Sequence, residues 1–229
     1  MRARVKPDRD ETVPVVRAAA PPQAVVVDWD GTITERDMLD DVARRFGDPA
    51  VYSEVEEGLL AGRISLRECI EREYQPVRAP LGEVVEHVLA NTRLRPGVPE
   101  LLELARERGW RLVVLSSGFR ELIDPVLARE GLDAEVLANA VEPRPDGWRV
   151  RWRDESRCAV CGQSCKRGSL PQEAHLVYVG DGYSDRCAAL AADRVFARRS
   201  LARHLSEEGV PYEPFEDFFD VVAALGGPA

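Results

Sequence analysis

The sequence lacks any long hydrophobic run, internal repeat or low-complexity tract. No apolar stretch approaches the ~20 residues that a membrane-spanning helix needs. Residues 1–23 mix Arg, Asp, Glu and Pro and lack the apolar central region of a secretory signal. These absences predict a cytoplasmic protein without membrane contact. We expect residues 1–22, which end at Pro21-Pro22, to form a flexible tail.

The chain also has a deficit of positive charge, with 31 Lys and Arg against 40 Asp and Glu and a formal net charge of −9. Nucleic acids and anionic membrane surfaces are bound by basic faces, so neither is an expected partner. The same charge repels a phosphorylated substrate, and a site for one would therefore need a metal ion or a local cationic group. At 229 residues, the chain is long enough for one large domain or for a core that carries an insert.

Two carboxylates follow the first strongly apolar run of the chain. Residues 24–27 predict a buried strand, and it leads into Asp28-Trp29-Asp30-Gly31-Thr32. Residues i and i+2 of an extended segment point the same way, so Asp28 and Asp30 would face one small volume. Like charges that close repel unless a cation compensates, and Mg²⁺, which prefers oxygen ligands, is the natural compensator. The alternative is a turn in which both side chains only accept bonds from nearby backbone N–H groups.

Two further apolar runs end in polar residues. Residues 110–115 precede Ser116-Ser117-Gly118, where a hydroxyl and exposed N–H groups could bind an anion or simply cap a helix. Residues 176–179 precede the acids of Gly180-Asp181-Gly182-Tyr183-Ser184-Asp185. Open α/β sheets bind ligands at the carboxyl ends of their strands. We therefore expect the second pair of acids to form the other half of a metal site.

The chain resembles the haloacid dehalogenase-like phosphatases. The four motifs of that family occur in order as Asp28-Trp29-Asp30-Gly31-Thr32, the strand that ends at Ser116, Lys166, and Gly180-Asp181. The resemblance implies a Mg²⁺-dependent phosphomonoester hydrolase that acts on a small phosphorylated metabolite. It makes Asp28 the nucleophile that forms an aspartyl-phosphate, and Asp30 the general acid and base.

The resemblance also implies the ligands of the metal and of the phosphate. Mg²⁺ would be held by Asp28, the backbone carbonyl of Asp30, and Asp181, with Asp185 acting through water or as a hydrogen-bond acceptor behind the ligands. The phosphoryl oxygens would be held by Ser116, Lys166 and the N–H groups of Ser117 and Gly118. Arg167, the neighbour of Lys166, is the alternative cation.

About eighty residues separate Thr32 from Ser116, far more than one strand crossover requires. Their periodicity predicts helices at Asp37–Phe46, at Val51–Leu60, from the N-cap Ser65 through Tyr74, and around Leu81–Leu89. The predicted fold class is α/β, a Rossmann-like parallel sheet core at residues 23–36 and 96–229 with an inserted α-helical cap subdomain at residues 37–95. That insert either stabilises the core or closes over the site and excludes water.

The rest of the core is predicted to alternate helices with strands. We expect helices at 98–108 and 119–130, and a strand at 135–141. Pro145-Asp146-Gly147 predicts a turn, and the alternation at 148–153 completes a β-hairpin with Trp148, Val150 and Trp152 on one face. Further on, we expect a short strand at 195–197, a helix capped by Ser200 and a last helix from about Glu216.

Three cysteines, Cys158, Cys161 and Cys165, lie just before Lys166. Their spacing is that of a zinc half-site, for which His175, Cys187 or an acid would have to supply a fourth ligand. The alternatives are reduced thiols or a labile disulfide between two of them. Cys69 lies on the apolar side of its predicted helix and is expected to pack in a core.

The substrate is left open between two branches of the family. Cys161-Gly162-Gln163-Ser164-Cys165-Lys166 and the Phe-Ala-Arg sequence near the end resemble the methionine-salvage 2-hydroxy-3-keto-5-methylthiopentenyl-1-phosphate phosphatases. Phosphoserine phosphatases resemble the chain too, and their charged cap residues could correspond here to Glu35, Arg67 and Arg72. Helical geometry places Arg67 at the edge of the apolar face and Arg72 toward solvent. A third hypothesis is a non-catalytic or redox-regulated binding protein that uses the Cys cluster; the oligomeric state is not predicted.

Overall fold

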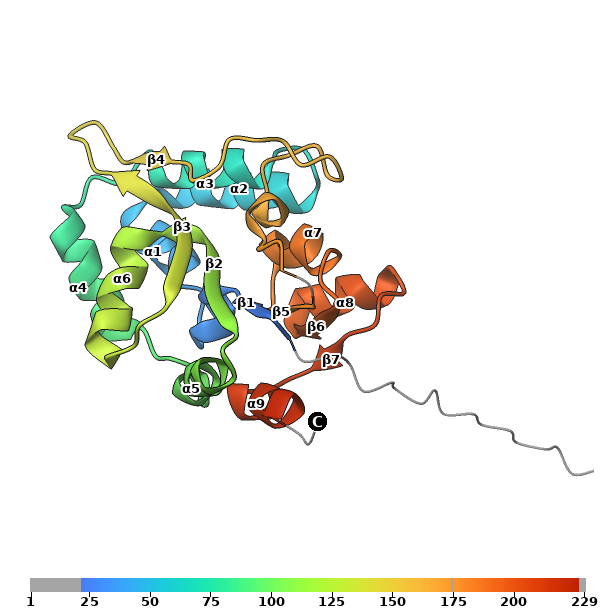
Figure 1. Cartoon of the computed structure of the whole chain (residues 1–229). Coiled ribbons are helices and arrows are strands. Elements are labelled where there is room, and N and C mark those ends of the chain that lie inside the picture. Colours follow the sequence, from blue (N-terminus) through green and yellow to red (C-terminus); the bar gives the residue numbers. More distant parts are fainter. Residues whose placement is uncertain (1–21, 174, 227–229) are drawn as a thin grey trace, which may run out of the picture.

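A mostly parallel β-sheet forms the centre of the protein, whose computed structural model describes residues 22–173 and 175–226 (Figure 1). The tail predicted for residues 1–22 falls almost wholly outside these residues. Within the described part the sheet has seven strands in the order β4-β3-β2-β1-β5-β6-β7. All neighbours are parallel except β3 and β4. The strands are β1 (Ala24–Val27), β2 (Arg111–Phe119), β3 (Glu135–Glu142), β4 (Arg149–Arg151), β5 (Leu176–Gly180), β6 (Arg194–Ala197) and β7 (Glu213–Pro214).

Helices cover both faces of this sheet, which confirms the predicted α/β class. Val25 and Val27 pack into one core cluster with α5 (Val98–Arg108), α6 (Arg120–Glu130) and α9 (Phe218–Gly226). Ala24 and Val26 pack into a second cluster with α7 (Arg186–Ala189) and α8 (Arg199–Glu207). A strand buried on both faces reads as an unbroken apolar run, which explains the composition of β1.

The segment before β2 is helical, as its periodicity predicted. It holds α1 (Met38–Phe46), α2 (Pro49–Leu60), α3 (Leu66–Tyr74) and α4 (Leu81–Asn91). Ser65 caps α3 by accepting the N–H of Glu68 at 3.1 Å. Pro49 begins α2 rather than preceding it, because Asp48 caps this helix and the first helical position needs no N–H donor. The two ends of the segment meet at a bridge between Thr34 and Leu94, and the division into core and cap remains a prediction.

The predicted β-hairpin is present, formed by β3 and β4. Trp148, the residue that precedes β4, is buried. Its ring stacks on Tyr74 with centroids 6.2 Å apart, and its indole N–H donates to the carbonyl of Ala79 at 3.0 Å. Val150 and Trp152 pack against the same cluster. The hairpin therefore lies beside α3 (Figure 1) and fixes the helical segment to the sheet.

Two predicted boundaries are wrong, and a third is shifted slightly. β2 continues past Ser116 to Phe119, with an irregular register in which Leu115 faces Leu137 and Phe119 faces Asn139. Helix α8 begins at Arg199, so Ser200 does not cap it and instead donates its hydroxyl to the carbonyl of Asp181 at 3.3 Å. The last helix begins at Phe218, two residues after the expected start near Glu216. The extension of β2 pairs with β3 and the Ser200 hydroxyl bonds Asp181, whereas α9 begins after Asp217, whose carboxylate accepts the N–H of Phe219 at 2.9 Å.

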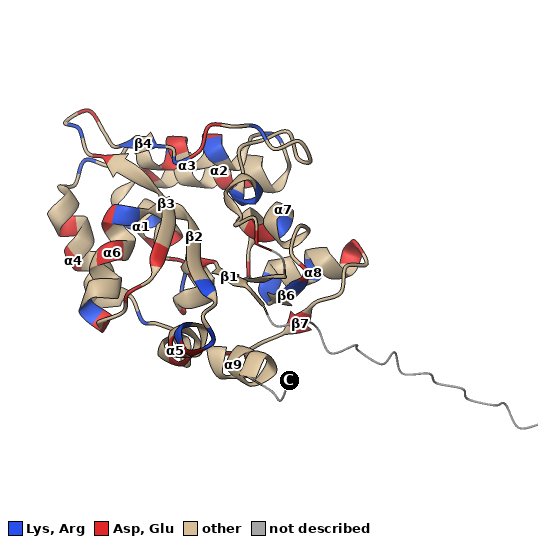
Figure 2. Cartoon of the chain, viewed as in Figure 1, with Lys and Arg blue, Asp and Glu red and all other residues tan. Residues whose placement is uncertain are grey.

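In Figure 2, Lys and Arg alternate with Asp and Glu along the helices and loops of the cartoon. Within the described ranges, no helix is long and apolar enough to cross a membrane.

Candidate active site

The turn after β1 places two carboxylates at the carboxyl edge of the sheet. Asp28 follows the last strand residue, and the chain then turns tightly through residues 29–33. Gly31 has φ of +77°, and a Cβ at this position would lie 2.6 Å from a carboxylate oxygen of Asp181. The buried guanidinium of Arg95 holds the turn by donating to the carbonyls of Gly31 and Thr32, each at 2.9 Å. The turn therefore requires glycine at position 31.

Three buried carboxylates gather at this edge. Asp28, Asp181 and Asp185 each offer an oxygen, and these atoms lie within 4.8 Å of one another. The pairing of Val27 with Val179 explains the approach, because β1 and β5 are adjacent parallel strands whose carboxyl ends lie level. Burial first, and then the charge of Asp185, raise the pKa of Asp28 well above its usual value. The same two causes raise the pKa of Asp181 to about 6.

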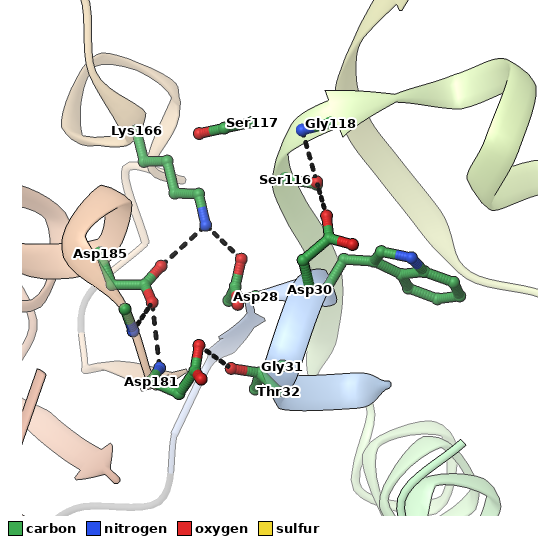
Figure 3. A network of polar contacts seen from close by, with 12 residues as sticks. Asp28, Asp30, Gly31, Thr32, Ser116, Ser117, Gly118, Lys166, Asp181 and Asp185 are labelled. Carbon is green, nitrogen blue, oxygen red and sulfur yellow. Dashed lines mark hydrogen bonds and ion pairs between the residues drawn. The ribbon is translucent and has the colours of Figure 1, made fainter. Parts of the chain in front are cut away.

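Lys166 supplies the buried cation of this cluster (Figure 3). It begins a single 3₁₀ turn, η2 (Lys166–Ser169), and its Nζ contacts carboxylate oxygens of Asp28 and, at 2.7 Å, Asp185. Burial alone would lower the pKa of Lys166, but the two carboxylates hold it above its usual value. Arg167 points elsewhere and donates to the carbonyl of Cys187 at 3.3 Å. Of the two predicted cations, the structure thus brings Lys166 to the carboxylates.

Asp30 lies on the other side of the turn from the three clustered acids. One of its oxygens accepts the N–H groups of Met38 at 3.1 Å and Leu39 at 3.2 Å, at the start of α1. Its other oxygen is 3.5 Å from the hydroxyl of Ser116. Burial, followed by the nearby charge of Asp37, raises the pKa of Asp30 to about 8. A carboxyl group with this pKa is mostly protonated at neutral pH and is able to donate a proton.

The predicted phosphate-binding residues of β2 lie next to Asp30, in the irregular part of the strand. Ser116 is buried, and its Oγ accepts the N–H of Gly118 at 2.8 Å. The N–H of Gly118 is therefore occupied in this structure, in contrast to the expectation that it is free for phosphate. Ser117 lines the cavity described next, and Asn139 fixes its backbone by donating to its carbonyl at 2.8 Å.

A cavity of about 220 Å³ separates these residues from the helical segment. On the sheet side it is lined by Asp28, Asp30, Ser117 and Asp181, and on the helical side by Glu56, Leu59, Leu66, Cys69, Ile70 and Glu73. None of the described residues that line it is Lys, Arg or His. Burial first, and then Glu56, raise the pKa of Glu73 to about 8. The cavity is therefore acidic and partly apolar.

Four residues that the sequence did not single out support the cluster. Tyr178 donates its hydroxyl to Asp185 at 2.7 Å, and Thr32 donates to Asp181 at 3.3 Å. Arg95 holds the turn after β1, as described above. Arg199, at a positive φ of 47°, contacts Asp181 at 3.4 Å. Two of the four carry a signal in the sequence: Thr32 closes the first motif, and Tyr178 is a hydroxyl inside an otherwise apolar strand.

The arrangement matches a known family. A family model described as haloacid dehalogenase-like hydrolase matches residues 25–190. This chain belongs to the haloacid dehalogenase-like hydrolases. It is 31% identical over 207 residues to the 2-hydroxy-3-keto-5-methylthiopentenyl-1-phosphate phosphatase of Geobacillus kaustophilus, covering 86% of this chain and 93% of that protein. It is 29% identical to the phosphatase of the same name from Brevibacillus brevis, covering 86% and 92%.

Solved structures share the fold of this haloacid dehalogenase-like hydrolase. One is a family hydrolase from Salmonella enterica serovar Typhi, with a TM-score of 0.71 and 17% identity, covering 91% of this chain and 73% of that one. Another is a substrate-bound phosphoserine phosphatase, with a TM-score of 0.67 and 17% identity, covering 90% and 99%. Together with the relatives above, the family assignment establishes a phosphatase.

Haloacid dehalogenase-like phosphatases generally use Mg²⁺, and the cluster fits this ion. Three buried carboxylates within 4.8 Å carry more negative charge than Lys166 and the half-exposed Arg199 together neutralise. Their oxygens are the ligand type that Mg²⁺ prefers. A cation beside Asp28 and Asp181 would also reverse the burial effect that raises both pKa values.

Proposed function

We propose that this phosphatase hydrolyses the phosphomonoester of a small metabolite through an aspartyl-phosphate on Asp28. The observation that carries the proposal is the position of Asp28. It is buried at the end of β1 beside Lys166, and it faces a cavity large enough for a small ligand. Lys166 and the metal site would reverse the negative field that otherwise repels a phosphate.

Asp28 acts as the nucleophile and Asp30 as the general acid and base. A carboxylate oxygen of Asp28 attacks phosphorus, and the bond from phosphorus to the leaving oxygen breaks. Asp30, whose raised pKa of about 8 keeps it protonated, gives its proton to that oxygen. In the second step Asp30 accepts a proton from the water that attacks the aspartyl-phosphate. Inorganic phosphate leaves, and Asp28 is restored as a carboxylate.

The remaining residues bind and position. Lys166 and the Oγ of Ser116 would hold the non-reacting phosphoryl oxygens, together with the N–H groups of Ser117 and Gly118 once the latter leaves Ser116. Mg²⁺, when bound, supplies charge that neutralises the phosphoryl group as negative charge develops. Asp28, Asp181 and the backbone carbonyl of Asp30 would hold it. Asp185 accepts the N–H groups of Asp181 and Gly182 and would act behind these ligands.

The cavity favours 2-hydroxy-3-keto-5-methylthiopentenyl-1-phosphate as the substrate. A methylthio group suits the apolar surface of Leu59 and Ile70, and a hydroxyl suits the carboxyl group of Glu73, which can both donate and accept when protonated. Relatives at about 30% identity carry this activity in their names. The helical segment at residues 37–95 would act as the cap, since it supplies one wall of the cavity.

Phosphoserine is the second candidate, and Arg67 is the residue that favours it. Arg67 lines a smaller pocket together with Ser116, Ser117 and Lys166. Its guanidinium, however, bonds Glu71 at 3.2 Å and lies 4.8 Å from the ring centroid of Trp152. The carboxylate of phosphoserine would have to displace those contacts or enter an acidic cavity. Glu35 is exposed and Arg72 pairs with Glu54 on the surface, so neither lies ready to bind an amino acid.

The test is hydrolysis of a substrate panel with and without Mg²⁺, using the wild type and Asp28→Asn. The panel contains 2-hydroxy-3-keto-5-methylthiopentenyl-1-phosphate, phosphoserine and an aryl phosphate. We expect Mg²⁺-dependent release of phosphate by the wild type only, with the highest kcat/KM for the methylthio compound. Preference for phosphoserine would overturn the substrate. No hydrolysis of any ester would overturn the catalytic proposal and favour the non-catalytic binding protein.

A further inference from the structure

The fold gathers four cysteines outside the active site. Cys158, Cys161 and Cys165 lie in the connection from β4 to η2, and Cys187 comes from α7. Their sulfur atoms all lie within 4.8 Å of one another, and those of Cys158 and Cys187 are 3.6 Å apart. The fifth cysteine of the chain, Cys69, is buried elsewhere in an apolar cluster. All five are free thiols in this structure.

The spacing of these sulfurs suits a tetrahedral metal rather than a disulfide. A zinc–sulfur bond of about 2.3 Å places the sulfurs of a tetrahedral site about 3.8 Å apart, close to the separation of Cys158 and Cys187. A disulfide needs about 2.05 Å, well below the 3.6 Å between Cys158 and Cys187, and one disulfide would leave two of the four sulfurs without a role. Packing does not account for them either, because Cys161 is exposed.

The turn from Cys158 to Cys161 directs backbone N–H groups toward Cys158. The N–H of Val160 points to the Sγ of Cys158 at 3.4 Å, and such bonds stabilise a thiolate. Gly162, at φ of +70°, follows Cys161 and returns its N–H to the carbonyl of Cys158 at 2.9 Å. The backbone is therefore already folded around the sulfur of Cys158.

We propose that Cys158, Cys161, Cys165 and Cys187 bind one Zn²⁺ in a structural four-thiolate site. Each thiol loses its proton to solvent when the metal binds, and no electrons are transferred. Four protein ligands leave no open position for water or substrate, so the site would stabilise structure rather than catalyse.

The site would connect the two segments that carry the active-site ion pair. Cys165 directly precedes Lys166, and Cys187 lies two residues after Asp185. Lys166 and Asp185 are themselves 2.7 Å apart. After Trp152, which packs against the main core, the connection to η2 contains no helix or strand, and its one branched aliphatic side chain, Val160, is exposed, so residues 153–165 have no core of their own. A zinc ion would supply the missing anchor and position Lys166.

Metal analysis tests the site on the untagged full chain, purified under reducing conditions. We expect about one zinc per chain in the wild type and at least about a fivefold loss in Cys161→Ser and Cys187→Ser. Cys69→Ser, the matched control outside the cluster, should keep its zinc. Asp28→Asn should keep it too, which separates this metal from one bound at the carboxylates.

Cobalt substitution of the wild type keeps the test valid if a cysteine variant fails to fold. Co²⁺ bound here should give thiolate charge-transfer bands and the intense visible bands of tetrahedral coordination, and Zn²⁺ should abolish both. The proposal is overturned if the wild type holds no more zinc than Cys161→Ser, or if the cobalt spectrum lacks thiolate bands. A mass reduced by the hydrogens lost in disulfide formation, with no metal bound, would also overturn it. None of these results depends on phosphatase activity.

Discussion

Replacing Lys166 with methionine is expected to destabilise the metal-free protein strongly. The side chain is about 2% exposed and is the buried cation beside Asp28 and Asp185. Lys166→Met keeps most of the apolar stem but leaves three clustered carboxylates without that charge. Breaking a buried ion pair from one side costs about 3–5 kcal/mol. For a chain of this size, that corresponds to a Tm lower by about 10 °C.

The loss should depend on pH in a definite direction. Burial already raises the pKa of Asp28 above its usual value and that of Asp181 to about 6, and losing Lys166 raises both further. The folded variant then binds more protons than the unfolded chain, so its stability falls as pH rises. The difference from the wild type should therefore be small near pH 4 and largest above about pH 7. Added Mg²⁺ should restore part of the stability, because it binds the folded state.

Thermal unfolding followed by circular dichroism over this pH range measures the effect. Arg167→Met is the matched control, because the neighbouring guanidinium contacts only a backbone carbonyl among its described polar partners. We expect it to cost less than about 1 kcal/mol at every pH. Equal stability of the two variants, or a Lys166→Met deficit that does not grow with pH, would refute the charge coupling of the cluster.

Three other substitutions probe the site. Asp28→Asn should reduce turnover of an aryl phosphate to below about a few per cent while circular dichroism stays native, because an amide is a poor nucleophile; substantial residual turnover would contradict the role of Asp28. Gly31→Ala should lower Tm and Mg²⁺-dependent activity, since its Cβ would meet Asp181 at 2.6 Å, whereas Gly182→Ala, with nothing closer than 3.9 Å, should keep near-native Tm; equal effects would contradict this steric argument. Arg67→Ala should change kcat/KM by less than about twofold for both the metabolite and an aryl ester, because Arg67 already bonds Glu71. A tenfold loss confined to the metabolite would show instead that Arg67 contacts the leaving group.

Local patterns predicted much of the fold. β1 and β5 read as strands because parallel strands buried on both faces are continuously apolar, and each is followed by an acid. The helices before β2 read correctly because each has one apolar face and three have side-chain caps. β7 was not predicted, since a two-residue strand carries no periodicity and depends on its neighbour β6.

Local sequence patterns did not predict the residues that support the site. Arg95 precedes a Pro-Gly turn and looks like a surface charge, yet its guanidinium is buried against the turn after β1. The N–H of Gly118 was expected to be free, but the bulge in β2 returns it to Ser116. The contacts of Arg95 join segments that are far apart in the sequence, and the contact of Gly118 depends on a backbone irregularity that no short stretch of sequence specifies.

The sequence by itself determined which residue types stand at the ends of the apolar runs, and hence the family and the chemistry proposed for Asp28 and Asp30. Only the tertiary structure decided which of two adjacent cations meets the carboxylates and which cysteines come together. Lys166 and Arg167 are adjacent cations, and only the direction of the 3₁₀ turn brings the first to the carboxylates. Cys187 joins three cysteines more than twenty residues away because η2 packs against α7. Side-chain chemistry is local, whereas proximity depends on which buried surfaces pack together across the chain.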